Sequence, residues 1–359
     1  MGRFGFEVVD ADGHVVETRP ALEQHGWSST GTDLIDALLS WERRADWGDR
    51  LRPEVNGGAF DPAERLRDMD REGIDVAVNY PTALLGVSDF PDTASSLAAC
   101  RAYNDWFAAR YHAAAPDRLF AAALVPLGDG AAAAAEARRA VRELDAVGVM
   151  VQPYAGSRHL CDPELDALWA AAQELDAPLG IHGSRHTCAP HLRFDTFRNQ
   201  ARFYALSHPF QQQVAMGDLV LGGVLERFPA LKVVFLESGV GWMPHFIDRL
   251  DEAYASVRED WTDGRYELPR APHEYLLSGR CWFSCEPDEP NLAAAVDYLG
   301  EDQVVYASDY PHFDCSFPDS VQELVDESDL DTLVVRKVAA SNARALYGLV
   351  AAPAPGATR

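Results

Sequence analysis

Short apolar runs alternate with helix-length amphipathic segments along almost the whole sequence, and this alternation predicts a single (β/α)8 TIM barrel. The apolar runs number about eight, which favours a closed barrel of parallel strands over an open doubly wound sheet. An open nucleotide-binding sheet would carry a glycine-rich turn after its first strand, whereas neither GxGxxG nor GKS/T occurs in the sequence. With 359 residues, 47% of them hydrophobic, the chain can bury one large core.

The predicted strands are the apolar runs, and several of them lead directly into polar residues. The first reads FEVVDAD, and the last reads QVVYASDYP. In chain order the predicted strands cover residues 6–12, 74–81, 120–127, 147–154, 178–184, 232–239, 281–286 and 303–311.

The predicted helices lie between these strands. PAERLRDMDREG is the clearest example, because Pro62 suits the first turn of a helix and Gly73 ends it. In chain order the predicted helices cover residues 62–73, 95–116, 131–148, 163–177, 217–231, 242–257, 289–300 and 330–348.

The domain organisation follows from the unbroken alternation. No linker-like shift in composition interrupts it, so we expect one barrel domain over residues 1–350. Two stretches, about 18–50 and 186–207, are too long for simple barrel loops, and we interpret both as lid insertions at the C-terminal face of the strands. The Ala/Pro/Gly-rich residues 351–359 are expected to be a flexible tail.

Charge and cysteine content narrow the possible partners. A formal net charge of −25 repels phosphate backbones and anionic membranes, so we expect neither nucleic-acid nor membrane binding. No apolar stretch is long enough to span a bilayer, and the N-terminus lacks the pattern of a secretory signal. The six cysteines form no CxxC pair and are interpreted as reduced thiols. We therefore expect a cytoplasmic protein that acts on a small molecule.

Acids and histidines stand at the ends of four predicted strands, where barrel enzymes carry their chemistry. Asp12 and His14 follow the first strand, two residues apart, so their side chains share one face. His182, Glu237 and Asp309 end three later strands. Two imidazoles and two carboxylates from this set would suit zinc or manganese, with an open position for water or substrate.

Each of these residues also has a plain structural interpretation. Asp12 could cap a turn, a single histidine at a strand end is usually a hydrogen-bonded core residue, and Asp309 could belong to a turn. Because all of them fall at strand ends of one repeating pattern, a shared site is the better interpretation.

Several motifs resemble one family in their order and over about residues 7–348. These are VVDADGHVVE, GIDVAVNYPT, YNDWFAARYHAAAPDRLFAAALVPL, GIHGS, RFPALKVVFLESGVGWMPHFIDRLDE and VVYASDYPH. Together they resemble the amidohydrolase superfamily, in its branch of aminocarboxymuconate semialdehyde decarboxylase-like proteins.

The resemblance implies a metal-dependent TIM barrel, expected to be a homodimer, with one divalent ion per chain, Zn²⁺ or Mn²⁺. Its ligands would be an acid-x-His pair on the first strand, a histidine on the fifth and an aspartate on the eighth, which here are Asp12, His14, His182 and Asp309. One departure stands out. The better-known decarboxylases of the family usually have a histidine before glycines after the sixth strand, where this chain has Glu237.

Other polar residues near the predicted site are weaker candidates. His208 is interpreted as catalytic or as a supporting residue just before the helix that leads to the sixth strand. Arg185 and His186 could bind a substrate carboxylate or lie in a solvated loop. Trp242 could line the pocket or only pack at a helix start, and His312 could orient the strand-eight aspartate or the substrate.

Two reactions fit these residues. The first is a hydrolysis, or the reverse condensation or cyclisation, of a small aromatic or carboxylate-bearing molecule. The metal activates water, and Glu237 or Asp309 takes its proton. The alternative is a non-oxidative decarboxylation of an aromatic or enoic acid, which the family background favours. We place hydrolysis slightly ahead, because a carboxylate such as Glu237 is a ready base near neutral pH. A barrel that only binds a small molecule is disfavoured by the intact set of four ligands.

Overall fold

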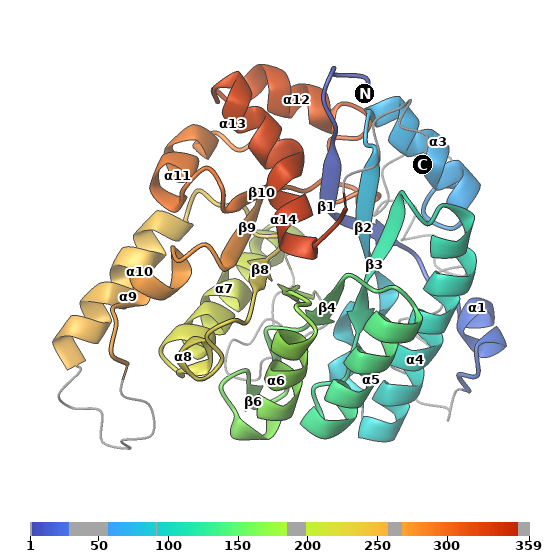
Figure 1. Ribbon diagram of the computed structural model, residues 1–359, viewed down its shortest axis with the longest axis horizontal. Coiled ribbons are helices and arrows are strands. Elements are labelled where there is room, and N and C mark those ends of the chain that lie inside the picture. Colours follow the sequence, from blue (N-terminus) through green and yellow to red (C-terminus); the bar gives the residue numbers. More distant parts are fainter. Residues whose placement is uncertain (1, 29–56, 91, 185–198, 258–267, 351–359) are drawn as a thin grey trace.

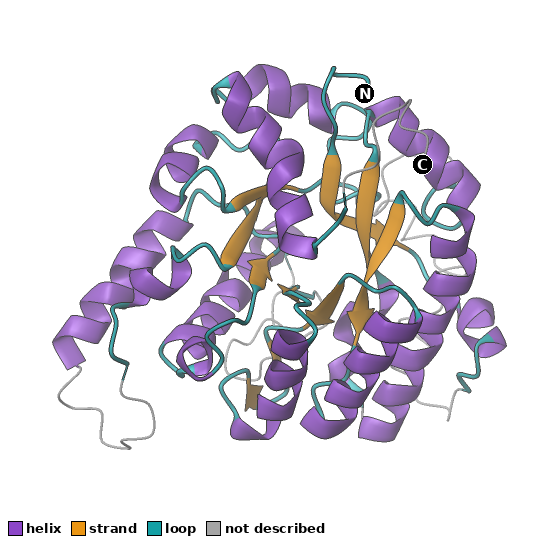
Figure 2. Cartoon of the chain, in the orientation of Figure 1, coloured by secondary structure: helices purple, strands orange, loops and turns teal. Residues whose placement is uncertain are grey.

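The barrel is seen directly in the computed structural model, which describes residues 2–28, 57–90, 92–184, 199–257 and 268–350. Eight parallel strands form one sheet that curves into a barrel, with helices around its outside (Figures 1 and 2). The strand order is β1-β2-β3-β4-β7-β8-β9-β10. The first and last strands meet through backbone hydrogen bonds, from Asp309 N to Asp12 O (3.0 Å) and from His14 N to Tyr310 O (2.6 Å). The predicted (β/α)8 TIM barrel is therefore confirmed.

All eight predicted strands are present, and each is shorter than or similar in length to the predicted run. Their residues are almost completely buried, as expected for parallel strands that are covered by helices outside and packed inside. The barrel strands are β1 (Val9–Val15), β2 (Val76–Pro81), β3 (Leu119–Leu124), β4 (Gly148–Val151), β7 (Leu179–Ile181), β8 (Val233–Phe235), β9 (Cys281–Cys285) and β10 (Val304–Tyr306). A small antiparallel ribbon, β5 (Tyr154–Ala155) and β6 (Arg158–His159), follows β4.

The helix predicted from Pro62 to Gly73 is present, and capping residues mark both of its ends. Helix α3 (Pro62–Glu72) is capped by Asp61, whose Oδ1 accepts hydrogen bonds from two backbone amides of the first turn. It ends at Gly73, whose φ of 93° is left-handed. The other helices on the barrel's outside include α1 (Arg19–Gln24), α4 (Thr93–Arg110), α5 (Gly130–Glu143), α6 (Asp166–Glu174), α9 (Met243–Val257), α10 (Pro272–Leu276), α11 (Leu292–Leu299), α12 (Ser320–Glu327), α13 (Thr332–Arg336) and α14 (Asn342–Tyr347).

The helices differ from the prediction in several places. Helices α10 and α12 were not predicted, and the helix predicted over 330–348 is divided into α13, a π-helical turn (Lys337–Ser341) and α14. The largest difference is at α7. Helix α7 runs from Gln200 to Val220, and a short α8 (Val224–Arg227) follows it, where the sequence predicts one helix over 217–231. His208 therefore lies inside a helix and not before one. Residues 200–207, predicted as part of a lid insertion, form the first two turns of α7. The segments 29–56, 185–198 and 351–359, which hold most of the predicted insertions and the tail, lie outside the described residues.

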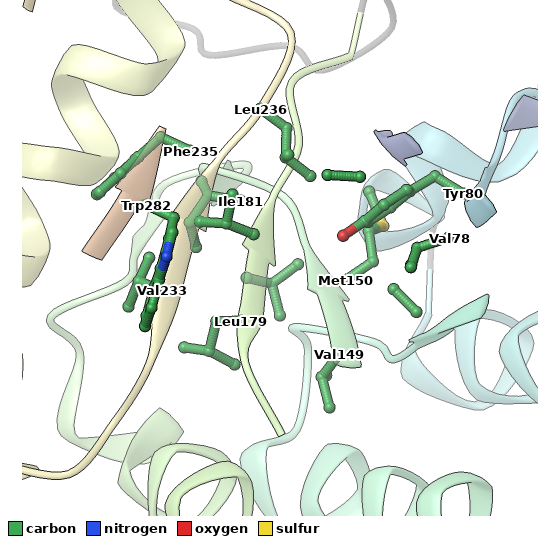
Figure 3. Packing of buried hydrophobic residues seen from close by; sticks show 14 of the residues in the cluster. Val78, Tyr80, Val149, Met150, Leu179, Ile181, Val233, Phe235, Leu236 and Trp282 are labelled. Carbon is green, nitrogen blue, oxygen red and sulfur yellow. The ribbon is translucent and has the colours of Figure 1, made fainter. Parts of the chain in front are cut away.

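The interior of the barrel is filled by side chains that include Tyr80 and Met150 (Figure 3). Tyr80 crosses the interior from β2, and its hydroxyl lies 2.8 Å from that of Tyr347. Gly180 on β7 makes room for this ring, because a β-carbon there would lie 2.5 Å from the Tyr80 hydroxyl. The core blocks the barrel, so a ligand can enter only at one of its ends. In the part of the chain that the structure describes, no helix is long and apolar enough to cross a bilayer.

Candidate metal centre

A β-bulge in β1 separates the surroundings of its two aspartates. The register pairs Asp10 with Ala77 and Gly13 with Asn79, so β1 holds one residue more than β2 between these pairs. Asp10 accepts hydrogen bonds from the backbone N–H (2.9 Å) and hydroxyl (2.6 Å) of Ser308 beyond β10. Asp12 instead faces the histidines at the centre of the barrel mouth.

His14 and His182 form the centre of the site. Each Nδ1–H donates to a backbone carbonyl, that of Pro81 (2.9 Å) for His14 and that of Gly183 (2.8 Å) for His182. In the neutral imidazoles Nε2 therefore carries a lone pair and no proton. These two Nε2 atoms lie 3.2 Å apart. Two facing lone pairs at this distance repel each other unless a cation lies between them.

Neutral imidazoles are what the surroundings favour. Burial is the main cause that lowers the pKa of His182 to about 3, and burial together with His312 and His182 lowers the pKa of His14 well below its usual value. An unprotonated Nε2 is the form that binds a metal ion.

Asp12 completes this set of donor atoms. Its Oδ1 lies 3.6 Å from the Nε2 atoms of both His14 and His182. The side chain is 1% exposed, and neither carboxylate oxygen accepts a hydrogen bond from the described residues. Leaving a buried carboxylate without a partner costs free energy. Burial, with the neighbouring Asp309 and Asp10, accordingly raises its pKa well above the usual value.

The spacing of these donors fits a divalent metal ion. Ligands about 2.1 Å from an ion in tetrahedral geometry are about 3.4 Å from one another, and the three distances in this set are 3.2, 3.6 and 3.6 Å. Nitrogen and carboxylate donors suit zinc and manganese. The site thus fits one divalent ion, as predicted.

Asp309 follows β10 and contacts the centre through His14. Its Oδ1 lies 3.4 Å from His14 Nε2 and 2.7 Å from His312 Nδ1. It forms a second donor cluster with His14 and His312, which shares only His14 with the cluster of Asp12, His14 and His182. Burial raises the pKa of Asp309 to about 6. Its role as a fourth ligand therefore needs a small movement toward the first cluster and stays a prediction.

Glu237 lies on the side of His182. Its Oε2 is 3.1 Å from His182 Nε2 and 3.5 Å from His208 Nδ1. Burial, followed by the negative charges of Asp309 and Asp12, raises its pKa well above the usual value. Glu237 and Asp309 both have left-handed backbone conformations, with φ of 53° and 50°. Such conformations are costly for residues other than glycine, and they cluster at functional sites.

A pocket above this centre is strongly acidic. No lysine or arginine is among its described lining residues. Tyr204 of α7 also lines it, and the Tyr204 ring is 5.9 Å from that of Phe313. Six acids contribute to the wall: Asp12, Glu237, Glu286, Asp288, Asp309 and Asp314.

The structure does not place the remaining predicted residues at the pocket. Arg185 and His186 lie outside the described residues. Trp242 donates its indole N–H to the Ser238 carbonyl (2.9 Å) and packs near Phe246, and it is not among the described residues that line the pocket. Its role in substrate binding stays a prediction.

Residues that hold the strand ends were not predicted. Gln212 of α7 donates both amide protons, to the carbonyls of Ile181 (2.7 Å) and Leu236 (2.8 Å), which directly precede His182 and Glu237. Gln211 accepts a hydrogen bond at Oε1 from the Ser184 N–H (2.9 Å) and donates one from Nε2 to the Ser184 carbonyl (3.0 Å). Both glutamines are completely buried. The only signal in the sequence is the run FQQQ inside an otherwise apolar region.

The fold and the site define a metal-dependent barrel enzyme of the amidohydrolase type. The sequence profile of the family described as Amidohydrolase matches residues 9–349. The chain belongs to this family, which confirms the resemblance found in its motifs.

Known proteins similar to this chain include two decarboxylases. The chain is 26% identical over 260 residues to 2-amino-3-carboxymuconate-6-semialdehyde decarboxylase from Dictyostelium discoideum, covering 72% of this chain and 68% of that protein. It is 25% identical over 342 residues to a gamma-resorcylate decarboxylase from Polaromonas sp., covering 92% and 98%.

Among solved structures, the chain resembles the 5-carboxyvanillate decarboxylase LigW2 from Novosphingobium aromaticivorans. The TM-score is 0.77 at 22% identity, over 97% of this chain and 98% of that one. That structure contains manganese and 3-methoxy-4-hydroxy-5-nitrobenzoic acid. At this level of identity the likeness supports the barrel fold.

Proposed function

We propose that this protein is a metal-dependent carboxy-lyase that removes CO₂, without oxidation, from a small aromatic carboxylic acid. The observation that carries the proposal is the pair of unprotonated Nε2 atoms of His14 and His182, which lie 3.2 Å apart. Beside them is the Asp12 carboxylate, which accepts no hydrogen bond from the described residues. The similarity to a gamma-resorcylate decarboxylase over 92% of the chain supports the substrate class.

Asp12, His14 and His182 would hold the ion, with Asp309 as the fourth ligand. Mn²⁺ and Zn²⁺ both suit these donors, and manganese is the metal in the LigW2 structure. When bound, the ion supplies a Lewis acid that neutralises the substrate carboxylate and stabilises charge on the ring. The acidic pocket makes this positive charge necessary, because none of its described lining residues is a lysine or arginine.

Glu237 is the proton donor in this proposal. The bond between the ring and its carboxylate carbon breaks, CO₂ leaves, and the electron pair stays on the ring carbon, which takes a proton from Glu237. Burial, followed by the negative charges of Asp309 and Asp12, raises the pKa of Glu237 well above its usual value, which favours the protonated form of this carboxyl group. His208, whose Nδ1 lies 3.5 Å away, is placed to return a proton to Glu237 after each turnover.

His312 orients Asp309 in this proposal. The 2.7 Å contact between its Nδ1 and Asp309 Oδ1 fixes the carboxylate toward His14. Arg185, His186 and Trp242 remain proposed contacts of the substrate. A homodimer is proposed from the family resemblance alone. A reducing, cytoplasmic location is supported by the five described cysteines, all of which are free thiols.

Hydrolysis is the second candidate, and one observation favours it. The Glu237 carboxyl group lies 3.1 Å from His182 Nε2, where a base could take a proton from water. The raised pKa of Glu237 opposes this role, because a base must be deprotonated at the working pH. The sequence-based preference for hydrolysis is therefore less well supported than decarboxylation.

The test is a panel of hydroxybenzoic acids beside a panel of esters and amides, incubated with metal-loaded protein in D₂O. Decarboxylation predicts release of CO₂ and one deuterium on the ring carbon that lost it, as seen by NMR. Cleavage of esters or amides without CO₂ release from any acid would favour hydrolysis and overturn the proposal.

A further inference from the structure

The loop that carries Glu237 is held at its far end by an acid from the neighbouring loop. Residues 236–242 connect β8 to α9, and Glu289 belongs to the loop between β9 and α11. Oε1 of Glu289 accepts hydrogen bonds from the backbone N–H groups of Val240 (2.8 Å) and Gly241 (2.7 Å). Its Oε2 also lies 3.0 Å from Val240 N. Hydrogen bonds of this kind to a carboxylate are about twice as strong as those between neutral groups.

The start of the loop is held by β9, the strand that precedes the Glu289 loop. The N–H of Glu237 donates to Ser284 Oγ at 3.2 Å. Ser284 belongs to β9, is 2% exposed and lines the acidic pocket. Both ends of the segment are therefore hydrogen-bonded to side chains from β9 and the loop that follows it.

The backbone conformation between these two ends depends on the surrounding contacts. Glu237 is left-handed with φ of 53°, a conformation that persists only where the surrounding structure enforces it. Gly239 is also left-handed, with φ of 64°, and a β-carbon there would lie 2.7 Å from Glu289 Oε1. The loop thus wraps closely around the Glu289 carboxylate, in the manner of backbone nests that bind anions.

We infer that Glu289 is a positioning residue for Glu237: through Val240 and Gly241 it fixes the loop that aims the Glu237 carboxyl group at His182. Glu289 is not among the described residues that line the pocket, so it acts through the loop and not on the substrate. The inference rests on the proposed function in one respect, that Glu237 takes part in the reaction.

The competing explanation is that Glu289 only stabilises the start of α9 (Met243–Val257). A stabilising role predicts loss of folding free energy with unchanged turnover. A positioning role predicts a lower kcat with nearly unchanged KM and metal content. A shift of about 1 Å in a catalytic group can cost on the order of 100-fold in rate.

The experiment compares Glu289→Ala and Glu289→Gln with the wild-type holoenzyme. For Glu289→Ala we expect kcat to fall roughly 10- to 100-fold, KM to change less than about threefold, and bound metal to stay at the wild-type level. Glu289→Gln keeps one acceptor oxygen and should recover part of the loss. The matched control is Glu274→Gln, since Glu274 also accepts a backbone hydrogen bond, from Ala271 N at 2.8 Å, at the start of α10. It should lose stability only.

A double-mutant cycle with Glu237→Gln separates the inference from the proposed function. If Glu289 acts through Glu237, the double variant Glu237→Gln/Glu289→Ala should have a kcat less than about threefold below that of Glu237→Gln alone. Two results would overturn the inference. One is a loss of kcat in the double variant that equals the product of the two single losses. The other is a wild-type kcat in Glu289→Ala while Glu237→Gln is impaired. Wild-type turnover in Glu237→Gln alone would instead overturn the catalytic role of Glu237.

Discussion

The Nε2 atoms of His14 and His182 face each other across 3.2 Å, while the Nδ1 of each ring donates to a backbone carbonyl. The two carbonyls fix which nitrogen carries the proton, and they leave two lone pairs and the Asp12 carboxylate pointing at one volume. A bound cation is what makes this arrangement stable.

The first prediction is that the purified protein contains about one equivalent of zinc or manganese per chain, because the donors form one mononuclear site. His182→Ala should lose both the metal and the activity. The measurement is elemental analysis after dialysis, beside turnover. His273→Ala is the control, since His273 is an exposed histidine that also contacts a carboxylate, Asp251 at 2.7 Å. Full occupancy in His14→Ala would disprove this assignment, as would a second tightly bound ion.

The second prediction concerns Glu237→Gln, which is nearly isosteric. It should keep the fold and the metal and lose roughly 10²–10⁴-fold in kcat, because it removes a positioned proton donor. Metal content and turnover are measured on the same sample. Loss of the metal would show that Glu237 is a ligand. Near-normal turnover would show that Glu237 takes no part in the chemistry.

The third prediction concerns the closure between β1 and β10. Ser308→Ala removes the 2.6 Å hydrogen bond to Asp10 and the 3.1 Å bond from Tyr310 N, on either side of Asp309. We expect the free energy of unfolding to fall by about 1–3 kcal/mol, because a buried carboxylate loses a donor. Metal affinity should fall as well, since Asp309 is less firmly held. Urea unfolding and metal titration measure the two effects.

The control for the stability and metal-affinity measurements is Ser341→Ala. Ser341 is exposed, and its hydroxyl makes a long 3.4 Å contact with the Arg336 carbonyl. It should leave both quantities unchanged. Wild-type metal affinity in Ser308→Ala would show that the Asp10–Ser308 contact stabilises the fold without positioning Asp309.

Much of the fold could be predicted because buried parallel strands are continuous apolar runs, and all eight were visible in the sequence. Helix α7 was predicted incorrectly because its buried face carries Gln211 and Gln212, which a hydrophobic pattern does not recognise. These glutamines bind strand-end carbonyls and amides, a role that only the three-dimensional neighbourhood reveals.

The convergence of the polar strand ends could be predicted from the sequence, whereas the roles of these residues stay predictions. Asp12, His14, His182, Glu237 and Asp309 do converge, because strand ends of a closed barrel meet at one mouth. The raised pKa of Glu237 could not be predicted from the sequence, since it depends on burial and on carboxylates from other strands. The bulge between Asp10 and Gly13 was equally hidden, and it separates two aspartates that simple alternation would place together.

The last prediction concerns Glu17, a completely buried acid just after β1. It accepts hydrogen bonds from the backbone N–H groups of Thr82 and Leu84, and burial raises its pKa to about 7. Because the folded state holds the proton more tightly than the unfolded state, the stabilisation is complete below pH of about 4.5 and is lost as pH rises to about 7. A shift of this size corresponds to about 3 kcal/mol.

Glu17→Gln cannot ionise, so the free energy of unfolding of this variant should fall less than that of the wild type between pH 5 and 8. Urea unfolding across this pH range measures the two slopes. Other buried acids, such as Glu72 with its pKa of about 7, add a slope of the same sign, but this slope is common to both proteins and cancels in the difference. The exposed Glu143→Gln is the control and should keep the wild-type slope. Parallel pH profiles for the wild type and Glu17→Gln would show that Glu17 is ionised in the folded protein at pH 5, stabilised by the two amides that point at it.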